Sequence, residues 1–193
     1  MLHLAAAAAA GVGVGALSLG GQALGGVWGR LGNSGAVWLC AAFVVGSMLD
    51  TTRRAALGGF LTLAGAVIGY YAAASWFVSA GVNATSVGIW VATAAVGGPV
   101  FGAAGEIWRR RKGWPRIAAA ALLGGALVGE SLYLAGSAPD AMFVGGLMAV
   151  IGLAMPGVML NAWRDRVRGW LLLLAFACLT FGAYHLIDWV FAR

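Results

Sequence analysis

The sequence predicts an all-α protein, a polytopic transmembrane helical bundle of about seven spans. Three observations predict this class. The 193 residues are 62% hydrophobic and only 9% charged, whereas a soluble domain carries about 25% charged residues. Apolar runs close to the ~20 residues of a transmembrane helix alternate with short polar breaks. Glycine occurs 32 times, and small residues within apolar runs let membrane helices approach closely.

Each predicted helix is an apolar run between two polar breaks. The first run, "MLHLAAAAAAGVGVGALSLGG", lacks the basic n-region of a secretory signal, so we expect it to remain as a span. A bundle of about six spans, in which this first segment lies as an interfacial helix, is the alternative count. The predicted spans form a single integral membrane domain, 1–193, and are residues 4–26, 34–50, 55–79, 87–107, 117–136, 141–161 and 169–190.

The charges in the breaks predict the orientation. Ten of the 12 Lys and Arg residues lie at 50–54, 108–116 and 161–168, which are alternate breaks. Because positive loops mark the cytoplasmic side, we expect a cytoplasmic N-terminus and, with seven spans, an external C-terminus. The segment "RRRKGWPR" would also suit anionic lipid headgroups, although orientation alone explains its charge.

Composition also excludes several classes of function. The net charge of +6 comes from short clusters between apolar runs, so it signals topology and predicts no nucleic-acid partner. The longest break is about nine residues, which leaves any site to be formed by the helices themselves. Cys40 and Cys178 each lie within an apolar run, so we expect neither a disulfide framework nor a cysteine metal site. We expect no cofactor, and no motif of a known catalytic class predicts an enzyme.

Glu130, in "LLGGALVGESLYLAG", is a carboxylic acid within an apolar run. A charged group in a transmembrane helix costs a few kcal/mol, so such residues usually face a cavity or a partner. Glu130 is about 20 Å along its predicted span, in the outer third of the membrane. It is therefore the first candidate for a functional residue. The alternative is a hydrogen bond to Gln22, Asn33 or a tyrosine of another helix, which would fix the packing.

Other polar and aromatic residues are expected at the same depth. His185 and Asp188 are three apart and share a helical face; since zinc needs three or four ligands, we expect a local hydrogen-bonded pair and no metal site. Tyrosines and tryptophans at this depth also occur as interfacial belt residues. We predict that an outward-opening pocket is lined by Glu130, Gln22, Asn33, Tyr70, Tyr71, Trp90, Tyr133, His185 and Asp188.

Two further patterns predict packing. Glu106 has Arg109 and Arg110 at helical spacing, so we expect a structural ion pair. Glycines four apart place a small face on each helix, which packs within the monomer or docks a second copy or a partner subunit. These pairs are Gly11 and Gly15, Gly21 and Gly25, Gly65 and Gly69, Gly98 and Gly102, and Gly125 and Gly129.

Five segments carry a family resemblance: "LGGQ" (19–22), "RLGNSGAVWLCAAFVVGSML" (30–49), "GYY" (69–71), "GGPVFGAAGEIWR" (97–109) and "GESLY" (129–133). They resemble the actinobacterial multi-pass proteins of the uncharacterised family DUF6518, over roughly residues 15–135, and the last two spans are similar in hydropathy. The resemblance implies an actinobacterial plasma-membrane protein and brings no activity. Its family-like positions are Gln22, Asn33, Tyr70, Tyr71 and Glu130.

Three functions follow from these patterns. The first is binding or transport of a small solute, with Glu130 as polar anchor and aromatic residues as pocket walls. The second is a non-transporting accessory subunit whose glycine faces contact a partner. The third is an intramembrane enzyme acting on lipid through Glu130, His185 and Asp188. We expect membrane lipids and a small molecule as partners in the leading case.

Overall fold

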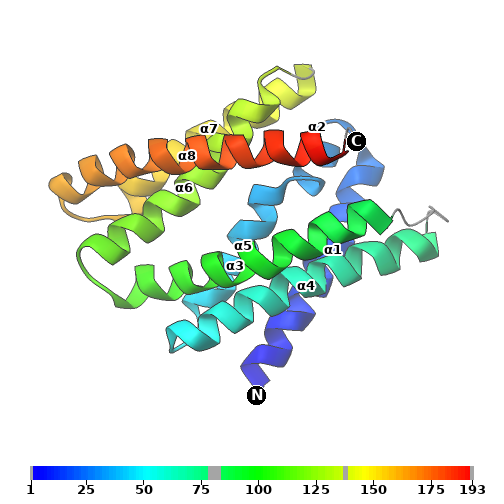
Figure 1. Ribbon diagram of the computed structural model, residues 1–193, viewed down its shortest axis with the longest axis horizontal. Helices are drawn as coiled ribbons and strands as arrows, with labels where there is room; N and C mark the ends of the chain where they lie inside the picture. The colour runs from blue at the N-terminus through cyan, green and yellow to red at the C-terminus, as the bar shows by residue number, and fades with distance from the viewer. Residues whose placement is uncertain (1, 78–83, 137–138, 192–193) are drawn as a thin grey trace. The chain divides into compact units, whose positions relative to one another are not determined.

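The computed structural model describes residues 2–77, 84–136 and 139–191 (Figure 1). Throughout these ranges the regular structure is α-helical, which confirms the all-α prediction. The helices are α1 (Leu2–Leu24), α2 (Gly26–Gly32), α3 (Gly35–Ser47), α4 (Thr52–Phe77), α5 (Ala84–Arg110), α6 (Trp114–Leu134), α7 (Pro139–Met159) and α8 (Trp163–Phe191).

Six of these helices, α1 and α4 to α8, are long and apolar enough to cross a membrane. The shortest of the six have 21 residues, which at 1.5 Å per residue extends about 30 Å, the thickness of the hydrocarbon layer. The chain is therefore a multi-pass membrane protein. The predicted end of the third span, residue 79, lies outside the described residues.

The predicted second span, 34–50, is wrong as a continuous crossing. Its helix, α3, has 13 residues and reaches only about 20 Å. The helix begins where it does because Ser34 caps it: the Ser34 hydroxyl accepts a hydrogen bond from the backbone N–H of Val37 at 3.1 Å. Serine and asparagine favour such caps over helix interiors. Six helices have the length of a span, and α1, which the alternative count lays along the interface, is one of them.

The chain divides into two compact units, which we call unit 1 (Met1–Glu106) and unit 2 (Ile107–Arg193). The boundary lies within α5, so that the last turn of this helix belongs to unit 2. Each unit is described by itself below.

In unit 1, α1 and α4 lie parallel at a very short distance. A Cβ atom on Gly65 would lie 2.5 Å from the carbonyl oxygen of Ala8, and one on Gly69 would lie 2.8 Å from the Cα of Val12. Residue numbers increase in the same direction along both helices, so the helices are parallel. Glycine is required at these contacts because any side chain would meet the backbone of the other helix.

The part of the chain that connects the end of α1 to the start of α4 consists of α2 and α3. α2 runs back along α1: a Cβ on Gly21 would lie 2.9 Å from the carbonyl oxygen of Trp28. Gly25 and Gly26, with φ of 69° and 49°, make the reversal, in a backbone region that favours glycine. Since α1 and α4 both have the length of a span, α2 and α3 together form the return crossing. The second crossing is thus a helix broken at Asn33 and Ser34.

Glycine faces also join α5 to its neighbours in unit 1. A Cβ on Gly98 would lie 2.7 Å from the Cα of Phe60 in α4, and one on Gly105 would lie 2.7 Å from the backbone nitrogen of Ser47 in α3. Every predicted glycine pair has at least one member in such a contact within its own unit; Gly25, at the reversal, has none within 4 Å.

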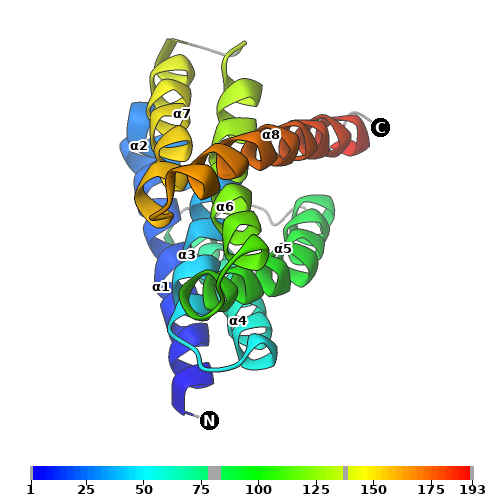
Figure 2. The ribbon, with the colours of Figure 1, turned by 90° about the vertical axis from the view of Figure 1, so that its left-hand side faces the viewer.

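In unit 2, α6 packs against both α7 and α8, and Figure 2 shows α6 and α7 side by side with α8 inclined to them. Glycines again mark the contacts. A Cβ on Gly124 would lie 2.6 Å from the carbonyl oxygen of Gly152 in α7, and one on Gly129 would lie 2.6 Å from that of Ala177 in α8. The buried core here includes Val128 and Leu173.

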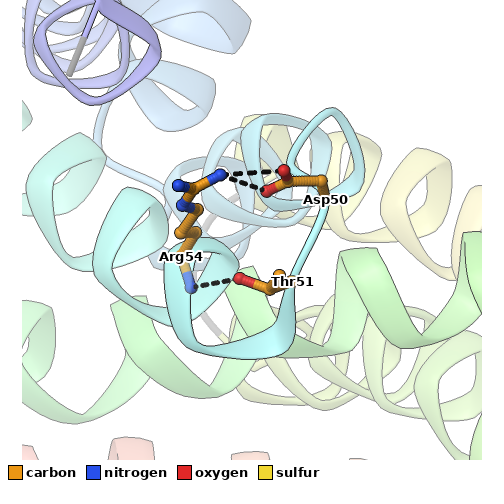
Figure 3. Close-up of polar contacts among 3 residues, drawn as sticks. All are labelled: Asp50, Thr51 and Arg54. Carbon is orange, nitrogen blue, oxygen red and sulfur yellow. Dashed lines mark hydrogen bonds and ion pairs between the residues drawn. The ribbon is translucent and has the colours of Figure 1, made fainter.

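The turn between α3 and α4 is held by local polar contacts (Figure 3). The Arg54 guanidinium donates to both carboxylate oxygens of Asp50, at 3.1 and 2.8 Å, and the backbone N–H of Arg54 donates to the Thr51 hydroxyl at 3.3 Å. These contacts start α4 at a defined residue.

The expected pairing of Glu106 with Arg109 or Arg110 is wrong. Glu106 is buried and accepts a hydrogen bond from the Thr52 hydroxyl at 2.8 Å. Thr52 is the first residue of α4, where the positive end of the helix dipole favours a carboxylate. The two arginines are exposed. Glu106 therefore ties α5 to the start of α4, a structural role with a different partner.

Candidate functional site

The interruption of the second crossing at Asn33 and Ser34 organises the candidate site. Non-helical backbone at membrane depth is tolerated only where protein covers it or where it lines a polar cavity. Protein covers Ser34, which is buried and bonded to Val37, while Asn33 is exposed. The break thus places one amide side chain where it can meet other polar groups.

Three polar side chains form a chain of hydrogen bonds at this break. The Tyr70 hydroxyl of α4 donates to Oε1 of Gln22 at 2.8 Å. Nε2 of Gln22, near the end of α1, donates to Oδ1 of Asn33 at 3.3 Å. Polar groups from α1, α4 and the break are therefore linked side chain to side chain.

Aromatic rings adjoin this chain of bonds. The Trp38 ring of α3 lies 5.4 Å from Trp90 of α5 and 6.4 Å from Tyr70, centroid to centroid. Tyr70 contacts Tyr71 edge to face at 5.2 Å. Such tilted arrangements are the favoured ones for aromatic pairs. The buried indole N–H of Trp38 donates to the Ser18 hydroxyl of α1 at 2.8 Å, which fixes this ring.

We call these residues the aromatic–amide cluster: Ser18, Gln22, Asn33, Trp38, Tyr70, Tyr71 and Trp90. The cluster offers amide and hydroxyl groups beside flat rings, and none of its side chains is charged at neutral pH. Such a set can hydrogen-bond a small molecule and stack against a planar part of it.

Five of the residues predicted from sequence come together in this cluster: Gln22, Asn33, Tyr70, Tyr71 and Trp90. The prediction missed Ser18 and Trp38. Both carried a signal, since Ser18 is a hydroxyl residue within the apolar first run and Trp38 lies one turn after the cap at Ser34. Neither signal identifies the partner, because the two residues lie on different helices.

Three other predicted residues come together in unit 2. The Tyr133 hydroxyl of α6 donates to Oδ1 of Asp188 at 2.9 Å. Tyr133 stacks on Tyr184 at 4.8 Å and contacts the His185 ring at 5.9 Å, and His185 also contacts Phe181 at 4.4 Å. Asp188 thus accepts from a tyrosine of another helix. Among the described residues, no three His, Cys, Asp or Glu side chains are grouped to hold a metal ion.

Glu130 lies in α6 between two contact residues. Gly129 packs against α8, where its Cβ would lie 2.5 Å from the Cβ of Thr180, and Ser131 packs against Gly145 of α7. Glu130 itself is only 3% exposed. Its burial matches the expectation for a carboxylic acid that the protein keeps away from lipid, and its role as polar anchor stays a prediction.

Comparison with known proteins gives one match. The family model described as "Family of unknown function (DUF6518)" matches residues 1–191. The match extends beyond the region in which the sequence motifs carried the resemblance and includes α7 and α8. No curated protein and no solved structure matches the chain.

Proposed function

We propose that this chain, which belongs to the DUF6518 family of unknown function, binds a small uncharged solute at the aromatic–amide cluster, as the binding step of solute capture or transport. The observation that carries the proposal is the chain of hydrogen bonds from Tyr70 through Gln22 to Asn33. It joins three elements at a broken helix, and transporters commonly build their substrate sites at broken helices.

The place of the cluster along the helices supports an outward-facing site. In α4, Tyr70 is 16 positions after Arg54, which corresponds to about 24 Å along the helix. Arg53 and Arg54 belong to the basic break that we assign to the cytoplasmic side. The cluster therefore lies in the outer half of unit 1, within reach of solutes from outside.

The chemistry of the cluster supports an uncharged solute. A buried ion needs a charged or strongly polar partner, because its desolvation is costly. The cluster offers two amides, hydroxyl groups and indole and phenol rings, with no charged member. These groups suit a planar molecule that carries both hydrogen-bond donors and acceptors.

Native mass spectrometry with two matched tryptophan variants tests the proposal. The protein is extracted gently, incubated with a bacterial metabolite extract and analysed for retained small molecules. Trp90→Leu removes a ring in contact with Trp38, whereas Trp76→Leu removes a ring of unit 1 that is 86% exposed. We expect a bound molecule in the wild type and in Trp76→Leu, and severalfold lower occupancy in Trp90→Leu, because a stacking surface is lost.

Two outcomes would overturn the proposal. One is the absence of any retained molecule in the wild type after incubation. The other is equal occupancy in Trp90→Leu and Trp76→Leu, which would assign the cluster to packing of α1, α3, α4 and α5. Thermal unfolding of both variants separates a loss of binding from a loss of folded protein.

A further inference from the structure

The carboxyl end of α7 in unit 2 is held by two arginines from different helices. The last carbonyl groups of a helix lack partners within the helix. The carbonyl oxygen of Met159 accepts from Nη2 of Arg116 at 3.1 Å and from the Trp108 indole at 3.2 Å. That of Leu160 accepts from Nε of Arg166 at 2.8 Å. Two guanidinium groups thus converge on adjacent carbonyls.

These guanidinium groups retain unused donors. Each guanidinium carries five N–H donors, and the bonds to α7 use one donor from each. Nε of Arg116 is buried and donates to no acceptor among the described residues. A buried donor without an acceptor is costly, so an oxyanion that accepts from Arg116 would be stabilising. Because α7 holds both side chains, little conformational entropy is lost when an anion binds.

The charge around this point is strongly one-sided. Segments 109–116 and 164–168 contain eight Lys and Arg residues and one acid, Asp165. Asp165 lies 3.8 Å from Arg168, and both side chains are well exposed, so this pair neutralises little of the field. An anionic group near Arg116 and Arg166 would meet several positive charges and few competing carboxylates.

Tryptophans place this region at the level of lipid headgroups. Trp114 and Trp163 are exposed, and the Arg168 guanidinium lies 5.3 Å from the Trp114 ring centre. Trp163 contacts Trp170 edge to face at 5.9 Å. Exposed tryptophans flanking the apolar helices are typical of the membrane interface. An anion bound at this site therefore lies in the same layer as the phosphate groups of the lipids.

We propose that the phosphate group of an anionic phospholipid binds at the end of α7 through Arg116 and Arg166. The arginine forks provide paired N–H donors for phosphate oxygens, and the adjacent tryptophans contact the interfacial part of the lipid. This site is independent of the solute proposed for unit 1. It assigns to two arginines a role beyond orienting the chain in the membrane.

Lipid nanodiscs with defined composition test this assignment. The full-length protein is reconstituted in phosphatidylcholine with increasing phosphatidylglycerol, and retained lipids are counted by native mass spectrometry. Arg116→Gln and Arg166→Gln are compared with Arg110→Gln and Arg164→Gln, which remove one positive charge each from exposed positions. We expect phosphatidylglycerol binding to weaken about tenfold in the first pair, the effect of losing one charge-assisted hydrogen bond, and to change little in the second.

Arg116→Lys separates the phosphate site from the capping of α7. Lysine keeps the charge and loses the fork, so the number of phosphatidylglycerol molecules retained per protein should fall although the charge is unchanged, whereas diffuse charge attraction alone would leave that number as in the wild type. Equal effects of all four glutamine variants would overturn the proposal in favour of diffuse charge attraction. Displacement of the lipid by millimolar inorganic phosphate would overturn the assignment to lipid and indicate a soluble phosphate ligand instead.

Discussion

Unit 1 and unit 2 use polar residues in opposite ways. Unit 1 joins uncharged groups side chain to side chain, as Tyr70, Gln22 and Asn33 do at the break before α3. Unit 2 places most of its ionisable groups at helix ends, where Asp188 accepts from Tyr133 and Arg116 donates to α7. An apolar surrounding requires polar groups to satisfy each other, whereas groups at the ends can also use water and headgroups. Glu130, buried within α6, is the exception in unit 2.

The largest expected effect concerns the orientation on which this comparison depends. Cys40 and Cys178 are first replaced by serine, and a single cysteine is then placed at Arg111 or at Gly136, on opposite sides of α6. A membrane-impermeant thiol reagent applied to intact cells should label the Gly136→Cys protein and leave the Arg111→Cys protein unlabelled, since positive loops stay inside. The reverse labelling pattern would invert the assigned topology.

Packing of unit 1 gives the next effect. A Cβ on Gly15 would lie 2.6 Å from the backbone nitrogen of Tyr70, whereas one on Gly13 would meet nothing within 4 Å. Gly15→Val should lower the free energy of unfolding by at least about 1–3 kcal/mol, because backbone cannot yield to a side chain as another side chain can. Unfolding in detergent, followed by tryptophan fluorescence, measures this change. Similar stability of Gly15→Val and its control Gly13→Val would contradict the close contact of α1 with α4.

A matched pair of glutamine variants tests whether Glu130 has a role that an ordinary buried carboxylate does not have. Glu130→Gln and Glu106→Gln alter the two buried glutamates, both 3% exposed, and Glu106 has a structural partner in Thr52. The prediction from sequence that Glu130 is the polar anchor requires Glu130→Gln to lose retained small molecule in native mass spectrometry while Glu106→Gln keeps it, whereas binding at the aromatic–amide cluster of unit 1 alone leaves the occupancy of both variants unchanged. Equal occupancy in both variants would assign Glu130 to packing.

The smallest effect tests the hydrogen bonds of the aromatic–amide cluster. Tyr70→Phe removes the donor to Gln22, while Tyr71→Phe alters the neighbouring ring of the same cluster. We expect Tyr70→Phe to cost about 0.5–1.5 kcal/mol in stability, the usual net value of one hydrogen bond, and Tyr71→Phe to cost less. Thermal unfolding of both variants measures the difference. A larger loss from Tyr71→Phe would show that the bond to Gln22 does not organise the cluster.

The fold was largely predictable because hydropathy is a local property. Six predicted runs correspond to six long helices, and their described boundaries shift by three residues or fewer, except that α8 begins six residues before its predicted start at 169. The prediction of the second span failed because apolar composition does not show where a helix is interrupted. The capping signal of Asn33 and Ser34 was present in the sequence, and helix geometry around it would have predicted two short helices.

The sequence predicted which residues belong to the site better than it predicted which residues contact each other. Depth along the helices selected Gln22, Asn33 and Tyr70, which do contact one another. Spacing along one helix paired Glu106 with nearby arginines, whereas its partner, Thr52, lies 54 positions away in the chain. Spacing along one helix cannot identify an interaction partner that lies on a different helix.

The sequence by itself determined the class of the molecule: a multi-pass helical membrane protein. Composition is sufficient for this because the cost of exposing polar groups to lipid acts on each segment separately. Only the tertiary structure decided that Ser18 meets Trp38 and that Arg116 and Arg166 converge on the end of α7. Those contacts depend on which helices pack against each other, and close backbone contacts at glycines select the helices that do.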